Sequence, residues 1–109
     1  RRELWSHPAN EHLRINGYMS YLTFLNAATR FDTLVVNDTD TTGSSFSVNP
    51  FLPSKYADYA GSGAAVWGIM MKDSPLSTLP LDFASQAGDL EQARGVLDEL
   101  FRWARYNAR

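Results

Sequence analysis

The sequence predicts a small α+β domain in which an N-terminal and a C-terminal helix pack on a short antiparallel sheet. Three observations lead to this fold class: an amphipathic C-terminal segment, a helical pattern nearer the N-terminus, and two strand-like segments around a polar loop. The chain has 109 residues, of which 44% are hydrophobic and 13% aromatic, which is typical of one folded domain. We therefore expect residues 1–109 to form a single domain, with residues 1–10 as an irregular lead-in.

The C-terminal segment has the clearest helical pattern. Its apolar residues recur every three or four positions and so line one stripe of a helix: Leu90, Ala93, Leu97, Leu100 and Ala104. Asp89 stands at the N-cap position, and Gln92 three residues later fits a capping box. The pattern predicts a helix over residues 89–107 whose stripe faces the core, with Phe101 also in the core.

The predicted sheet is built around a central hairpin. Residues 33–36 (TLVV) and 46–48 (FSV) favour strands, and the sequence NDTDTTGSS between them is typical of an exposed tip. These segments predict a hairpin over Thr33–Val48 that supplies two antiparallel strands. Residues 60–71 (AGSGAAVWGIMM) are interpreted as a third, buried strand, although their small residues leave a helix open as an alternative.

Two helical segments are expected outside these elements. Apolar residues near helical spacing predict a helix over residues 17–30. Ser54 is a candidate cap for a short helical turn over residues 55–60. The segment 73–81 contains two prolines and is interpreted as a connection.

Composition excludes several classes of protein. The chain contains no cysteine, so disulfides, thiolate catalysis and cysteine-ligated zinc are excluded. The formal net charge of −2 argues against nucleic acid as the main partner. No apolar run approaches the roughly 18 residues that a membrane-spanning helix needs. We expect no cofactor, no membrane span, and a protein partner or self-association; the compartment is not indicated.

The end of the C-terminal helix is the predicted site of contact. Aromatic and arginine side chains, which are enriched at protein interfaces, alternate there. The residues are Arg102, Trp103, Arg105 and Tyr106. The sequence therefore predicts a non-catalytic interaction or assembly domain that acts through its C-terminal helix.

The polar loop resembles the opening of a calcium loop. Asp38, Asp40 and Thr42 place oxygen ligands at alternate positions, and Gly43 follows where such loops turn. Asn49 stands where the bidentate acidic ligand should be, so we expect no metal and keep calcium at these three residues as the alternative. His7 and His12 do not have the spacing of a metallopeptidase helix.

A second class of function also stays open. Aromatic and thioether side chains are typical lining residues of small-molecule pockets. The candidate lining residues are Tyr18, Tyr21, Trp67 and Met70. The alternative hypothesis is therefore a small enzyme or ligand-binding domain with a pocket among them.

Overall fold

The computed structural model describes Leu13 and residues 17–106, and only the backbone of residues 104–106. The predicted lead-in over residues 1–10 lies outside the described residues. The elements follow one another along the chain as α2 (Tyr21–Ala28), β1 (Thr33–Asn37), α3 (Lys55–Ala60), β2 (Ala65–Met70), the 3-10 helix η2 (Pro75–Thr78), β3 (Phe83–Gln86) and α4 (Leu90–Tyr106). None of the helices in the described part of the chain is long and apolar enough to cross a membrane.

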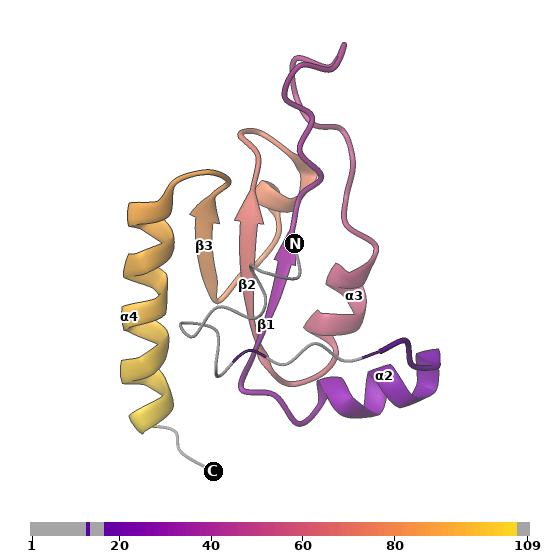
Figure 1. Ribbon diagram of the computed structural model, residues 1–109, viewed down its shortest axis with the longest axis vertical. Coiled ribbons are helices and arrows are strands. Elements are labelled where there is room, and N and C mark those ends of the chain that lie inside the picture. The colour runs from indigo at the N-terminus through magenta and orange to yellow at the C-terminus, as the bar shows by residue number, and fades with distance from the viewer. Residues whose placement is uncertain (1–12, 14–16, 107–109) are drawn as a thin grey trace.

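The three strands form one parallel sheet in the order β1-β2-β3 (Figure 1). β1 pairs with β2 from Thr33 opposite Ala65 onward, and β2 pairs with β3 from Trp67 opposite Phe83 onward. The mixed content of helix and strand is confirmed, but the predicted antiparallel sheet is wrong.

The hairpin predicted over Thr33–Val48 is wrong for a physical reason that is visible in β1. Its centre, Leu34-Val35-Val36, is a continuous apolar run, which is typical of parallel strands, rather than the alternation of a hairpin strand. Residues 46–48 form no strand. The loop after β1 and helix α3 together make the long crossover that a parallel pair requires.

A buried asparagine shapes this long loop. The side chain of Asn49 donates to the carbonyl oxygen of Thr39 (2.6 Å) and accepts from the N–H of Phe51 (2.8 Å). The rings of Phe46 and Phe51 meet edge to face, with centroids 5.5 Å apart. These contacts close the loop on itself, so the segment predicted as a second strand has no strand to pair with.

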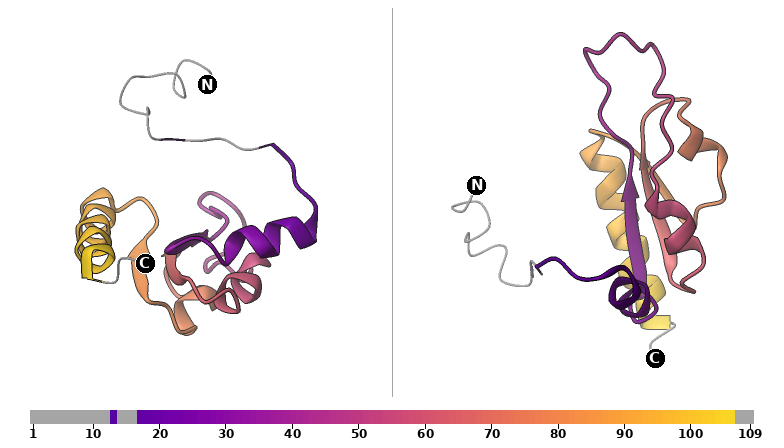
Figure 2. Two further views of the ribbon diagram at one scale, coloured as in Figure 1. Left: turned by 90° about the horizontal axis from the view of Figure 1, so that it is seen from below. Right: turned by 90° about the vertical axis from the view of Figure 1, so that its right-hand side faces the viewer.

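The core lies between the sheet and the crossover helices. Buried side chains of β1, β2 and η2 form it, with half-buried side chains from α3 and the η2–β3 connection packed around them: Val36, Val66, Met70, Leu76, Tyr56, Tyr59, Leu79 and Leu81. A Cβ atom on Gly68 would lie 2.6 Å from a methyl carbon of Leu81, so glycine permits this close approach. α4 lies on the other side of the sheet from α3, beside β3 (Figure 2).

The remaining predictions fare as follows. α3 occupies the predicted residues 55–60, although the Ser54 side chain makes no capping hydrogen bond, and β2 confirms a strand within residues 60–71. The helix predicted over residues 17–30 is shorter: it begins after Ser20, whose hydroxyl accepts from the N–H of Thr23 (3.4 Å), and ends at Ala28.

Strand β3 was not predicted. It has only four residues and follows a proline-rich connection, so its sequence carries little strand signal. Asp82 fixes its start: its carboxylate accepts from the N–H of Val66 (2.8 Å), and its own N–H donates to the Val66 carbonyl (3.0 Å). A side chain thus supplies part of the pairing that the short strand lacks.

Candidate interaction surface

The start of α4 is fixed to the end of β3. The carboxylate of Asp89 accepts from the N–H of Gln92 (3.0 Å), which confirms the predicted N-cap. The side chain of Gln92 does not return to the capping residue as in a capping box. It accepts instead from the N–H of Gln86, the last residue of β3. The helix is therefore held in place against the sheet.

Aromatic side chains attach the rest of α4 to the same strand. The ring of Trp103 meets that of Phe83 edge to face, with centroids 6.4 Å apart. Val96, two turns before Trp103 on the same side of α4, is buried. The buried Trp67 of β2 donates from its indole N–H to the hydroxyl of Ser85 in β3 (2.9 Å). α4 thus covers the β3 side of this sheet face.

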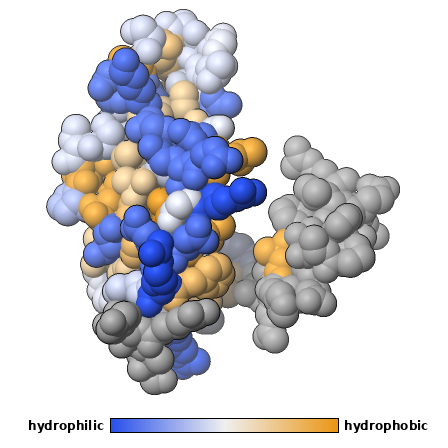
Figure 3. Space-filling model, turned by 90° about the vertical axis from the view of Figure 1, so that its left-hand side faces the viewer, coloured by the Kyte–Doolittle hydropathy of each residue, from blue (hydrophilic) through white to orange (hydrophobic). Residues whose placement is uncertain are grey.

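The predicted core stripe of α4 is only partly buried. Leu90 is 82% exposed, Leu97 is also exposed, and Phe101, predicted in the core, is 66% exposed. The reason is that α4 lies beside the last strand of a three-stranded sheet, so only the side that carries Val96 and Trp103 meets strands. Figure 3 shows hydrophilic side chains over the solvent side of α4 and hydrophobic ones beside them.

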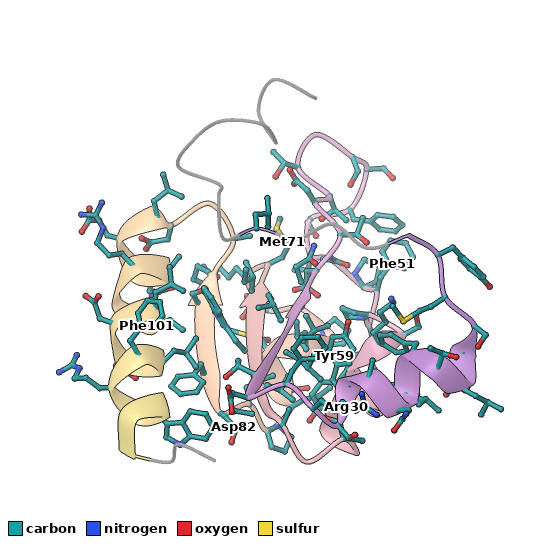
Figure 4. The ribbon with its side chains drawn as sticks, turned by 60° about the horizontal axis from the view of Figure 1, so that its bottom comes forward. Arg30, Phe51, Tyr59, Met71, Asp82 and Phe101 are labelled. Atoms are coloured by element: carbon teal, nitrogen blue, oxygen red, sulfur yellow. The ribbon has the colours of Figure 1, made fainter. Side chains whose placement is uncertain are left out.

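The exposed part of the stripe borders an apolar groove. A groove of about 290 Å³ lies between α4 and the start of β1, and its apolar walls include Phe31, Leu97, Phe101 and Trp103. Figure 4 shows the position of Phe101 on α4. We call this groove the α4 groove. Val35, on the same sheet face as Thr33 of the groove, is also exposed (45%).

The outer edge of β1 runs along the side of this surface. The carbonyl oxygen of Asp32 and the N–H of Asp38 form hydrogen bonds with β2. In a parallel pair every second residue of a strand bonds to the same neighbour, so the backbone groups of Leu34 and Val36 also bond to β2. The backbone groups of Thr33, Val35 and Asn37 therefore point away from β2. No other strand of the described residues pairs there. We call this side of β1 the free edge.

The free edge lacks the features that usually protect such edges. Native edge strands are usually protected from pairing with another chain by a charge, a proline, a bulge, or a helix or loop that covers the edge. β1 reads TLVVN and contains no charge and no proline, and its register with β2 is regular over all five residues. A second hollow, of about 580 Å³, lies beside the edge between β1 and the segment Leu52–Lys55. An extended segment therefore has space to reach the free edge.

The predicted contact residues Arg102 and Trp103 differ in their exposure to solvent. Arg102 is exposed, and its Nε–H donates to the Asp98 carbonyl one turn earlier (3.4 Å). Trp103 is half-buried against Phe83. The side chains of Arg105 and Tyr106 lie outside the described residues, so their contact role stays a prediction.

Sequence reasoning missed the exposed apolar residues of the surface: Phe31, Val35, Leu97 and Phe101. The uncharged sequence of β1 is a signal for Val35 alone, because an edge strand usually carries a charge. It could not be used before the strand order was known.

The four residues of the alternative pocket are not gathered in one place. Trp67 and Met70 are buried on opposite faces of β2. Tyr18 and Tyr21 line a hollow of about 460 Å³ between α2 and α3. There the hydroxyl of Tyr21 donates to the carboxylate of Asp58 (2.8 Å), and this hydrogen bond raises the pKa of Tyr21.

No three histidine or acidic side chains of the described residues gather to hold a metal ion. Asp38 is buried and Asp40 is exposed. Hydrogen bonds from Thr42 lower the pKa of Asp40, whose Oδ1 accepts from the Thr42 N–H (2.9 Å).

No family model, curated protein or solved structure matches this chain. The functional argument therefore rests on the geometry of the described residues.

Proposed function

We propose that this domain is a non-catalytic interaction module that binds a segment of a partner protein along the free edge of β1 and in the α4 groove. The partner segment adds a strand to the sheet, a mode in which backbone hydrogen bonds give affinity and side-chain pockets give specificity. The observation that carries the proposal is a regular, uncharged edge strand bordered by exposed apolar side chains.

The sequence of β1 supports this mode of binding. A parallel strand with a continuous apolar centre is normally covered by neighbours. Here Val36 is buried by the core, whereas Val35 is exposed on the other face. A further strand at the free edge would pair the outward backbone groups of Thr33, Val35 and Asn37.

The α4 groove supports the same partner. Side chains of the added segment that point to this face would lie beside Val35 and extend towards Phe31 and Phe101. Aromatic and aliphatic anchors that fill such hollows dominate binding energies at interfaces. The proposal keeps the contact role expected for the C-terminal helix and moves its centre from Trp103 to Leu97 and Phe101.

Affinity capture and light scattering test the proposal with three variants. Val35→Pro removes an outward N–H without breaking the ladder to β2, and Phe101→Asp places a charge in the groove. Leu90→Asp makes the same kind of change at an exposed leucine at the other end of α4. We expect the first two to lose about 2 kcal/mol or more of binding, about 30-fold, and the control to bind normally.

A photo-crosslinking amino acid in place of Phe101 identifies what covers the groove. We expect crosslinks to a partner protein or to a second copy of the chain. Adding Val35→Pro to the photo-crosslinking variant should reduce these crosslinks. Crosslinks confined to residues 1–16 of the same molecule, or equal binding by all three variants, would contradict the proposal.

A further inference from the structure

A single charged side chain lines the hollow of about 580 Å³ beside the free edge, which we call the edge hollow. Its walls come from β1 and the loop after it, from residues 52–54 and from α3, and Lys55 is the one charged residue among them. α3 and α4 lie on opposite sides of the sheet (Figure 2). In the α4 groove the charged lining residue is Asp32, and most of the other walls are apolar. The two sides of an added strand would therefore meet different surfaces.

The ammonium group of Lys55 has no carboxylate partner. Asp58 stands three residues along α3, a spacing at which a lysine and an aspartate of one helix commonly pair. Here the Asp58 carboxylate accepts from the hydroxyl of Tyr21 (2.8 Å), and Nζ of Lys55 lies 4.6 Å from the centre of the Phe24 ring. Lys55 forms no ion pair with a carboxylate of the described residues. Side chains of α2 thus hold the two charges apart and leave the ammonium open to an anion.

The acidic residues after β1 do not offset this charge in the edge hollow. The buried carboxylate of Asp38 accepts from the N–H of Met71 (2.7 Å) and from the hydroxyl of Ser74 (2.6 Å). Asp40 accepts from the N–H of Thr42 in the loop. Neither aspartate lines the edge hollow. A basic side chain that entered the hollow would find a like charge there and no carboxylate.

We propose that the segment added at the free edge carries an acidic side chain that points to the α3 side and pairs with the ammonium group of Lys55. Successive side chains of a strand point to opposite faces, so the residues before and after the acidic one point to the α4 side. There they meet the exposed Val35 and the apolar walls of the α4 groove. The partner segment therefore alternates apolar residues with an acidic residue between them.

This inference rests on the proposed function, because it states the chemistry of the segment that binds the free edge. Backbone pairing alone accepts many sequences, and the side chains at the edge select among them. Lys55 selects in two ways: it attracts an acidic residue and repels a basic one at the same position.

NMR titration of the intact chain with three peptides tests the inference. The peptides have the sequence Val-Thr-Val-X-Val-Thr-Val with Glu, Gln or Lys at X, and both ends are blocked so that only X carries a charge. We expect the Glu peptide to shift the amide signals of Val35 and Lys55. It should bind about three- to fivefold more tightly than the Gln peptide, because an exposed ion pair contributes modestly. The Lys peptide should bind most weakly, and sodium chloride at about 0.5 M should remove most of the preference.

Substitutions of the two lysines assign the preference to one residue. Lys55→Gln should abolish the preference for the Glu peptide, and Lys55→Glu should reverse it in favour of the Lys peptide. Lys72→Gln is the matched control, since it makes the same change at the other lysine of the chain, which is exposed and does not line the edge hollow. This variant should keep the preference.

The outcomes separate this inference from the proposed function. Equal binding of the three peptides to the wild-type chain, with loss of all three in Val35→Pro, would overturn the inference and leave the proposed function standing. A preference for the Glu peptide that persists in Lys55→Gln would overturn it as well. If no peptide shifts the Val35 amide signal at millimolar concentration, the proposed function fails together with the inference.

Discussion

Two leucines of this small domain, Leu76 and Leu90, differ strongly in burial. Leu76 of η2 is completely buried between the sheet and the crossover, whereas Leu90 at the start of α4 is almost fully exposed. Leu90 belongs to the apolar stripe of the predicted helix, whereas Leu76 lies in the proline-containing segment 73–81, so burial here depends on position relative to the sheet and not on the local pattern. The core side of the sheet is closed and the α4 side is partly open.

Leu76→Ala should destabilise the domain by about 2 to 5 kcal/mol, because it leaves a cavity in the core. Leu90→Ala should change the free energy of unfolding by less than about 0.5 kcal/mol. Denaturant unfolding followed by tryptophan fluorescence measures both. Equal effects of the two substitutions would show that η2 does not close the core.

The phenol of Tyr21 reports the contact between α2 and α3. Its hydrogen bond to Asp58 favours the neutral phenol and raises the pKa of Tyr21. The contact is therefore complete below the ordinary tyrosine pKa and is lost as pH rises through the elevated one. Asp58→Asn should lower the pKa towards its ordinary value in an NMR titration. An unchanged pKa would show that the two helices do not meet through this pair.

At the scale of elements, caps decide where the last helix begins. Asp89→Ala removes the acceptor for the Gln92 N–H and should cost about 1 kcal/mol. Asp98→Ala, in the middle of α4, is the control and should cost nothing or stabilise slightly, because alanine is the better helix former. Thermal unfolding followed by circular dichroism compares the two. A larger loss for Asp98→Ala would contradict the assigned cap.

Local signals predicted these elements well and their pairing poorly. The helix of α4, the strand of β2 and the helix of α3 are visible in periodicity and composition. The partner of β1 is not, because pairing depends on the path of the loop that Asn49 closes. The exposed surface was missed for the same reason. Whether Phe101 faces a strand or solvent depends on how many strands lie beside α4.

At the scale of the whole molecule, the sheet is asymmetric. β3 is covered by α4, whereas β1 ends the sheet with an uncharged edge and an exposed valine. The proposed interaction runs along the side of β1. The account therefore depends most on β1 being a strand with one paired and one free edge.

Amide hydrogen exchange of β1, followed by NMR, tests that claim most directly. In the isolated chain at low concentration, we expect slow exchange at Leu34 and Val36, which bond to β2, and fast exchange at Thr33 and Val35, which point outward. Binding of the partner should slow exchange at Thr33 and Val35. Slow exchange at all four amides in the isolated monomer, or continued fast exchange at Val35 in the complex, would contradict the account.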